Sequence, residues 1–419
     1  MNRWWIAVAS VVMQMALGAF YAWSVFIKPL NAQFGWSVPQ VTLAFTLSVF
    51  GLGTGAFWGG LLMNRKGPRL AAMVGAILWG GGVFLAGFSA HKLWWLYLAY
   101  GVIGGSGLGV GYVVPVAVLV KWFPERRGLM IGLAVGGFGA GALVVAPLAA
   151  RMIVAMGPLP TLMYLGIAYL IVILLAGSLM RNPPVGWKPQ GWVPSAAQMA
   201  QRSERDYTVG EAARTWQFWM LCLFLSLNSM AGISVASQAS LVFQDLGKVS
   251  AAVAAGMVGT VAIGNGAGRL FWSWVSDLAT RKITLFIMFL VQAILFAILP
   301  GLSSPNALLI VAFIILMCYG GGYGLIPAFA ADYFGPHHVG PIFGLMLLTW
   351  TFAAAFGPLA FAQMRQITGS YGEVLHIVAG VMAVSMILPA LLSPPHAAKR
   401  AAAAPAGVPA EVSPSDGGH

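Results

Sequence analysis

Long apolar runs alternate with short polar turns along most of the chain, and this pattern predicts a membrane protein. A helix that crosses the hydrocarbon core of a bilayer needs about 20 predominantly apolar residues. Twelve runs of about that length can be laid out along the sequence. We therefore predict transmembrane helices over residues 4–29, 39–63, 70–90, 93–120, 128–152, 157–180, 215–244, 250–276, 283–301, 304–331, 340–364 and 372–393.

One long polar stretch divides the predicted helices six and six. Residues 182–214 are rich in proline, serine and charge. We predict an N-terminal six-helix bundle over 1–181, a linker over 182–214 and a C-terminal six-helix bundle over 215–394. Residues 395–419 have low complexity, and we expect them to form a disordered tail. The predicted fold class is an all-α integral membrane protein.

The basic residues set the expected orientation. Most Lys and Arg residues fall in the loops on the same side as Arg3 and the linker. Cytoplasmic loops of membrane proteins carry such an excess. We predict that both termini and the linker are cytoplasmic, and that the protein crosses the plasma membrane, here a bacterial inner membrane, many times.

Composition excludes several other classes of protein. Hydrophobic residues make up 59% and charged residues 8%, whereas a soluble protein carries about a quarter charged residues. The net charge of +12 does not indicate a nucleic-acid partner, because the basic residues sit in short loops between apolar runs. Cys222 and Cys318 lie in separate apolar runs, so no disulfide framework is implied. We expect no enzyme activity, cofactor or metal site, and a monomer in the lipid bilayer.

The two halves of the sequence repeat each other. Tyr112 and Tyr323 each lie eleven residues before a phenylalanine that ends a predicted helix, namely Phe123 and Phe334. The loop after the second run also has a counterpart after the eighth run. A repeat of six plus six helices around one linker is the architecture of a transporter whose halves rock about a central site.

The layout resembles the major facilitator superfamily over essentially the whole chain. The loop Gly60–Arg69 is similar to the family signature G-x3-D-R-x-G-R, although Asn64 replaces the acid. The counterpart loop in the second half keeps its acid. The resemblance implies a fold of two pseudo-symmetric six-helix halves. It also implies loops that control conformation, with Arg65, Arg69, Asp277 and Arg281 as their functional residues.

Several segments resemble carboxylate carriers within that superfamily. Residues 122–137 resemble the monocarboxylate transporter motif Y-F-x-K-R-R-x-L-A-x-G-x-A-x-A-G, with matches at Phe123, Arg126, Arg127, Leu129, Gly132, Ala134 and Gly137. Residues 21–23, 217–219 and 265–269 are similar to the bacterial oxalate:formate antiporter branch. The resemblance implies that a carboxylate binds to an arginine of the eighth helix.

Arg269 is the strongest candidate for a binding residue on physical grounds as well. It lies inside the run 250–276, about 12 Å inward of Asp277 at 1.5 Å per residue. A guanidinium costs several kcal/mol in lipid, so such a residue faces a wet cavity or a partner. Its planar fork matches a carboxylate with two parallel hydrogen bonds. The alternative is a structural ion pair, but the acids all fall in loops or at the ends of the predicted helices, so no buried acid is expected to supply one.

Other candidate substrate-binding residues accompany Arg269. Asn265 lies one helical turn away and either orients Arg269, touches substrate or makes an ordinary bond between helices. Tyr112 and Tyr323 should offer hydroxyls from the two halves, with Tyr21 and Tyr319 as weaker candidates. The predicted apolar wall consists of Trp350, Phe138 and Phe352. Trp350 stands where the oxalate branch has a lysine, which favours a substrate with a single carboxylate.

We therefore expect a carrier of small monocarboxylates, lactate- or pyruvate-like, that works by alternating access. The family resemblance implies proton symport. Arginine does not release its proton in proteins, so the proton would have to move on the substrate, a water or the tyrosines. Two alternatives stay open: an oxalate/formate-type carboxylate exchanger, and a membrane sensor that transports nothing.

Overall fold

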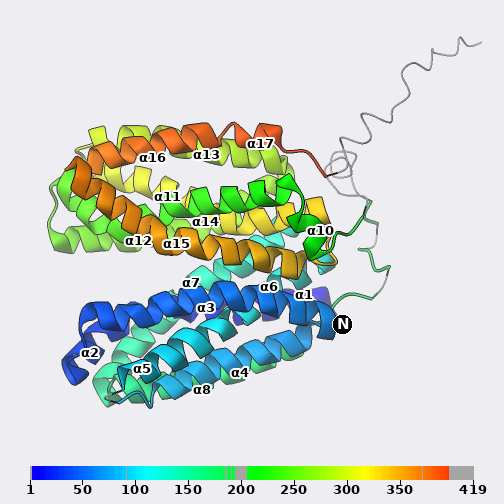
Figure 1. Cartoon of the computed structure of the whole chain (residues 1–419), viewed down its shortest axis with the longest axis horizontal. Coiled ribbons are helices and arrows are strands. Elements are labelled where there is room, and N and C mark those ends of the chain that lie inside the picture. The colour runs from blue at the N-terminus through cyan, green and yellow to red at the C-terminus, as the bar shows by residue number, and fades with distance from the viewer. Residues whose placement is uncertain are drawn as a thin grey trace, which may run out of the picture.

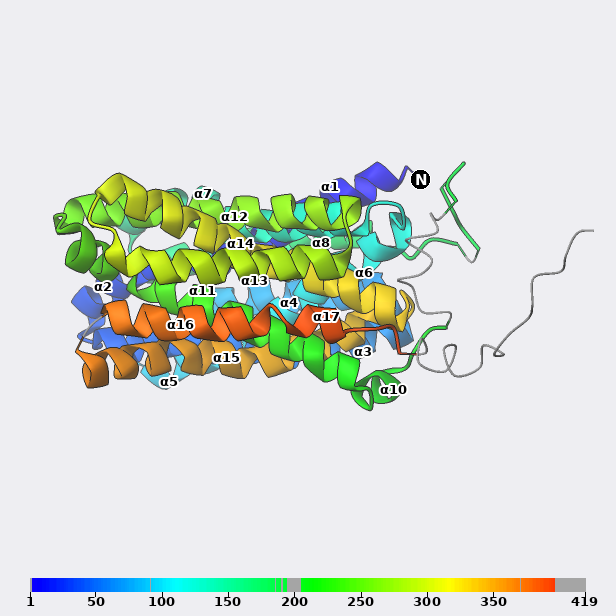
Figure 2. The same cartoon turned by 90° about the horizontal axis from the view of Figure 1, so that it is seen from above.

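The computed structural model describes residues 2–90, 92–184, 186–189, 191–193, 205–369 and 371–395, and every regular element within them is a helix. The long helices run side by side and form two bundles, which lie one against the other (Figure 1). The N terminus, α10 and α17 lie at the same end of the molecule in both views (Figure 2). We call this the terminal end and the opposite end the distal end.

The first bundle contains the N-terminal half of the chain. Its helices are α1 (Arg3–Gly18), η1 (Ala19–Trp23), α2 (Ser24–Phe34), α3 (Val38–Lys66), α4 (Pro68–Ala86), α5 (Leu93–Leu96), η2 (Tyr97–Gly104), α6 (Gly105–Trp122), α7 (Arg127–Met156) and α8 (Pro158–Ser178). α1, η1 and α2 together form the first crossing, and α5, η2 and α6 form the fourth. The half therefore crosses six times, as the apolar runs predict.

The second bundle contains the C-terminal half and is preceded by a short helix of the linker. Its elements are α10 (Val209–Ala213), α11 (Trp216–Gly247), α12 (Ala251–Leu278), α13 (Arg281–Ile298), η3 (Leu299–Gly301), α14 (Pro305–Phe334), α15 (Val339–Thr368), α16 (Tyr371–Ser385) and α17 (Leu388–Leu391). α10 was not predicted; Thr208 and Glu211 form a reciprocal cap that begins it.

The twelve predicted helices match the long helices of the two bundles, which confirms the all-helical fold. Eleven of the described helices are long and apolar enough to cross a membrane. The remaining predicted helix, 250–276, corresponds to α12, which carries the polar residues Asn265 and Arg269. Residues 396–419 of the predicted disordered tail, and residues 185, 190 and 194–204 of the predicted linker, lie outside the described residues.

Small residues let the helices approach closely. A side chain on Gly55 of α3 would collide with the backbone of Ser106 on α6, and one on Gly268 of α12 would collide with the backbone of Met317 on α14. Such packing is typical of helix pairs in lipid, where no hydrophobic effect drives the helices together. The tight fit of α12 against α14 fixes the face of α12 that carries Arg269.

The two bundles touch mainly along two helix pairs, with smaller contacts of α7 with α14 and of α6 with α15. α7 packs on α12, where Gly132 lies against the backbone of Arg269 and the side chain of Ser273. α3 packs on α15, where Gly344 lies against the backbone of Ala56. Gly and Ala at these crossings allow close contact between the two halves.

Candidate functional site

The guanidinium of Arg269 lies at the contact between the two halves. Its side chain is 1% exposed, and its Nη1 donates a hydrogen bond of 2.9 Å to the carbonyl of Val135 on α7. Its Nε has no hydrogen-bond partner among the residues that the structure describes. Arg269, a residue of the C-terminal half, therefore bonds to the N-terminal half and retains further N–H donors.

Aromatic rings surround the guanidinium. Its Cζ lies 5.0 Å from the ring centre of Tyr323 and 5.9 Å from that of Phe138. Phe138 in turn meets the edges of Tyr112 and Tyr21, with ring centres 5.0 and 5.5 Å apart. A cation over such rings gains about 0.5–2 kcal/mol each, more when desolvated. The rings therefore offset part of the cost of burying the charge.

A chain of hydroxyls continues the cluster on the C-terminal side. Tyr323 Oη donates to Tyr319 Oη at 3.1 Å and lies 3.2 Å from Ser229 Oγ on α11. The ring of Trp350 meets Tyr323 edge-on at 5.9 Å, and its Nε1 has no hydrogen-bond partner although it is buried. Buried donors without partners are costly. These groups therefore suit a polar ligand held beside the arginine.

Buried amides hold the tyrosine helices in place, and the sequence analysis missed them. Gln14 of α1 donates to the carbonyl of Tyr112 at 3.1 Å. Asn228 of α11 donates to the carbonyl of Tyr319 at 2.9 Å and accepts from Gln292 of α13 at 3.1 Å. In each half, an amide on the first helix fixes the fourth. The signal that could have found them is an amide side chain inside an apolar run.

Asn265 faces α14. Its backbone and Oδ1 lie against Gly320, and this Oδ1 has no hydrogen-bond partner. No hydrogen bond joins it to Arg269 among the described contacts. The structure thus brings Asn265 next to the α12–α14 crossing, and an orienting role for it stays a prediction.

Phe352 lies outside the cluster. It is 55% exposed and its ring meets Phe50 of α3 at 6.3 Å. Residues two apart on a helix point in roughly opposite directions, at about 200°, so Phe352 points away from the side on which Trp350 meets Tyr323. The other predicted aromatic residues of the site are brought together, but Phe352 is not.

The charge of Arg269 is not balanced by an acid in the described part of the chain. None of the described ion pairs includes it. The groups that interact with it electrostatically are Tyr21, Tyr112, Tyr319 and Tyr323. The site therefore presents one positive charge, hydroxyl groups and apolar rings.

A second set of buried charges lies toward the terminal end, and we call it the ion network. Arg127 of α7 binds Asp332 of α14 at 2.7 Å. Arg281 of α13 binds the other oxygen of Asp332 at 3.0 Å and binds Asp277 of α12 at 2.8 Å. The network contains two arginines and two aspartates, so its charges cancel.

The ion network also ties the two halves at the start of α7. Asp277 accepts hydrogen bonds from the backbone N–H groups of Gly128 and Leu129, at 3.0 and 2.7 Å. The first turn of a helix has unsatisfied N–H groups and a positive dipole end, so an aspartate there is favourable. α7 belongs to one half and Asp277 to the other, so the network holds the halves closed at the terminal end.

The sequence analysis named part of this network. Asp277 and Arg281 are in it, whereas Arg65 and Arg69 are exposed and take no part in a described ion pair. Arg127 and Asp332 were not predicted as conformational residues. The available signals were the position of Arg127 in the transporter-like segment and the position of Asp332 at the end of a predicted helix.

The pseudo-symmetric position in the other half shows no such network among the described ion pairs. There the end of α3 meets the start of α15, with Gly60 against the backbone of Gly340 and Pro341. Asn64 of α3 corresponds to Asp277, and Pro341 corresponds to Leu129 when Gly128 is aligned with Gly340. Asparagine carries no charge and proline has no N–H. The carboxylate of Asp277 and the N–H of Leu129, which bond to each other in one contact, thus have no equivalent at Asn64 and Pro341.

The closest contacts between α7 and α12 lie on the side of Arg269 nearer the terminal end. Gly128 and Gly132 of α7 lie against Ser273 of α12, and Gly139 lies beside Arg269. Farther toward the distal end, Val144 of α7 and Ile263 of α12 are exposed. Along this helix pair the contact is therefore tightest on the terminal side of Arg269 and looser toward the distal end.

Comparison with known proteins agrees with this architecture. The model of the Major Facilitator Superfamily matches residues 6–358 and 219–415. The oxalate:formate antiporter of Oxalobacter formigenes is 30% identical over 85% of this chain and 83% of its own length. The apicoplast pyruvate carrier 1 of Toxoplasma gondii is 26% identical over 71% of this chain and 64% of its own. The crystal structure of FucP in the outward conformation shares the fold, with a TM-score of 0.73, 14% identity, and coverage of 92% and 98%.

Proposed function

The chain belongs to the Major Facilitator Superfamily, and on that premise we propose that this secondary transporter carries small monocarboxylates of lactate or pyruvate size. The observation that carries the proposal is Arg269, a buried cation at the contact between the halves with donors to spare and no acid among its described partners. A buried charge of this kind is costly. A carboxylate supplied by the substrate would neutralise it.

The carboxylate would bind to the free edge of the guanidinium. One donor of Arg269 is engaged by Val135, and the others can form the paired hydrogen bonds that a carboxylate accepts. The hydroxyls of Tyr323 and Tyr112 lie on opposite halves and can reach the carboxylate or a substrate hydroxyl. Phe138 and Trp350 would contact the apolar remainder of the substrate.

The charge of the site favours one carboxylate over two. Arg269 supplies one positive charge, and the described surroundings add hydroxyls and rings but no second cation. A dicarboxylate would leave one negative charge unpaired and desolvated, which costs several kcal/mol. Trp350, which stands where a lysine would make the site dicationic, instead adds an apolar wall.

Alternating access would use the ion network as its closed contact. We place the terminal end in the cytoplasm because the basic loops lie there. A structure that is closed at this end and more loosely packed along α7 and α12 toward the other would correspond to a carrier facing outward. Binding of substrate to Arg269 and to the tyrosines of both halves would draw the distal ends together and allow the ion network to open.

We propose proton symport as the mode of coupling. Arg269 keeps its proton, so the proton would have to move on the substrate or through the hydroxyls of Ser229, Tyr323 and Tyr319. The test is uptake of labelled lactate into proteoliposomes under an imposed pH gradient. Uptake should follow the gradient, and uptake that is unchanged when the gradient is collapsed would reject coupling to protons.

A carboxylate exchanger is the second candidate, and the charge of the site favours it. An empty carrier would have to move the unbalanced charge of Arg269 back across the membrane, whereas a loaded carrier is neutral. One of the relatives is named an oxalate:formate antiporter. Uptake that requires a carboxylate inside the vesicles, and that oxalate inhibits more strongly than pyruvate, would favour exchange. Absence of any flux would favour a sensor.

A further inference from the structure

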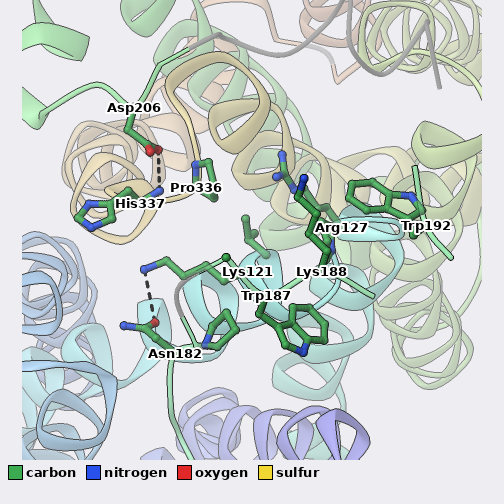
Figure 3. A pocket seen from close by; sticks show the side chains of 13 residues that line it. Lys121, Arg127, Asn182, Trp187, Lys188, Trp192, Asp206, Pro336 and His337 are labelled. Carbon is green, nitrogen blue, oxygen red and sulfur yellow. Dashed lines mark hydrogen bonds between the residues drawn. The ribbon is translucent and has the colours of Figure 1, made fainter. Parts of the chain in front are cut away.

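A cavity at the terminal end lies between the two halves and the linker. Its volume is about 530 Å³, within the range of pockets that hold small organic ligands. The N-terminal half contributes Lys121, Pro124 and Arg127, and the C-terminal half contributes Pro336 and His337. The linker supplies the remaining wall, including Asn182, Trp187, Lys188, Trp192 and Asp206, as Figure 3 shows. The proposed transport cycle does not use this cavity.

Positive charge dominates the lining of the cavity. Lys121 donates one hydrogen bond of 3.4 Å to Asn182, and an ammonium group has three N–H donors. Lys188 is exposed on the facing linker. Arg127 also lines the cavity while it binds Asp332. Asp206 is the one carboxylate among the described lining residues, and its Oδ1 accepts from the backbone N–H of His337 at 2.9 Å (Figure 3).

Two indole rings complete the lining. Trp187 packs edge-on against Trp122 with ring centres 4.9 Å apart, so its position is fixed by the N-terminal half. Trp192 lies on the same stretch of linker, beside Lys188 and Arg127 in Figure 3. Flat aromatic faces bind planar rings by stacking, and lysine ammonium groups bind phosphate. The two kinds of group occur together in this cavity.

We propose that this cavity is a binding site for a phosphate-bearing planar compound of nucleotide size that enters from the cytoplasmic side. Lys121 and Lys188 bind the phosphate, and Trp187 and Trp192 contact the ring. The ligand touches both halves and lies against Arg127, so it stabilises the closed terminal end. The expected consequence is that the ligand slows transport without competing with the substrate. That consequence, but not the binding itself, rests on the proposed function.

Binding is tested on the purified full-length protein by titration calorimetry with adenosine monophosphate as the probe. We expect saturable binding that weakens about tenfold or more in Lys121→Gln and in Lys188→Gln, because each removes a charged hydrogen bond. Lys66→Gln, an exposed lysine of the same end that does not line the cavity, should bind like the unchanged protein. Inorganic phosphate should bind at least tenfold more weakly than the nucleotide.

Other outcomes overturn the proposal at separate points. No saturable binding, or binding that Lys66→Gln weakens as much as the two cavity variants, removes the site. Equal affinity for inorganic phosphate removes the ring contact. Loss of nucleotide binding in nanodiscs with phosphatidylglycerol, but not in those with phosphatidylcholine alone, assigns the cavity to a lipid headgroup. Arg269→Gln should leave nucleotide affinity unchanged. Loss of nucleotide binding in this variant would place the ligand in the central site instead.

Discussion

Two groups of buried arginine lie between the halves of this transporter, and they differ in what balances their charge. Arg127 and Arg281 share Asp332 and Asp277, so the ion network is neutral by itself. Arg269 has a carbonyl and aromatic rings but no acid among its described partners. The first arrangement is complete without a ligand, whereas the second is not. The contrast separates a contact that holds the protein closed from a site that binds an anion.

The difference also bears on the energy of each conformation. Removing one partner of a buried ion pair leaves the other charge uncompensated, at a cost of about 3–5 kcal/mol. When the terminal end opens, water hydrates the charged groups of the ion network. This hydration offsets part of the cost of separating them. Arg269 meets the reverse situation, since it is uncompensated until substrate arrives. The contact at Arg269 is therefore stabilised only when substrate is bound. The ion network, in contrast, is stable by itself as long as the terminal end stays closed.

The largest expected effect is loss of transport in Arg269→Gln. Glutamine keeps some hydrogen bonding but removes the charge, so labelled lactate uptake into proteoliposomes should fall by about 100-fold or more. Thermal unfolding should not shift to lower temperature, because no described acid is left unpaired. Arg69→Gln, an exposed arginine, is the matched control and should retain uptake. Normal uptake in Arg269→Gln would remove the central site from the mechanism.

The ion network should respond in the opposite way, with loss of stability. Asp332→Asn leaves Arg127 without its described carboxylate partner and Arg281 with one of its two, so we expect destabilisation by about 3 kcal/mol. The double variant Arg127→Met with Asp332→Asn keeps the neutral pair Arg281–Asp277 and should recover part of the loss. Denaturation midpoints of the three proteins test this. A double variant less stable than Asp332→Asn would contradict charge balance as the cause.

A second cation in the central site should change which anion binds. Trp350→Lys would place an ammonium group near Tyr323 and Arg269, so oxalate should compete with labelled lactate about tenfold better than in the unchanged protein. Trp350→Phe, which keeps an aromatic wall without a charge, is the matched control. Unchanged competition by oxalate would show that Trp350 does not border the bound substrate.

The smallest effect should come from restoring the acid in the other half. The aspartate of Asn64→Asp would face the start of α15, where Pro341 lacks the N–H that Leu129 supplies at the start of α7. The uptake rate and the equilibrium constant of unfolding should therefore change by less than about threefold. Adding Pro341→Leu supplies the missing donor and should enlarge the effect. Uptake rates of the single and double variants compare the two. A large effect of Asn64→Asp alone would mean that the acid suffices without the second donor.

The sequence predicted the fold more fully than the site. Hydrophobic runs report burial in lipid directly, so the helices, the division into halves and the isolation of Arg269 could all be inferred. Contacts between residues far apart in the chain leave no such periodic signal. The pairing of Arg127 with Asp332 spans two halves, and Phe352 was assigned to the site although it points away from Trp350. The missed ion pair and the misplaced Phe352 both depend on which faces of two helices meet. The packing of the helices alone decides that.

The central claim is that Arg269 binds the carboxylate group of the substrate. The most direct measurement is calorimetric titration of the purified protein with lactate and with lactamide, which has an amide in place of the carboxylate. We expect saturable binding of lactate that Arg269→Gln abolishes, with no measurable binding of lactamide to either protein. Equal binding of lactate and lactamide, or lactate binding that survives Arg269→Gln, would contradict it.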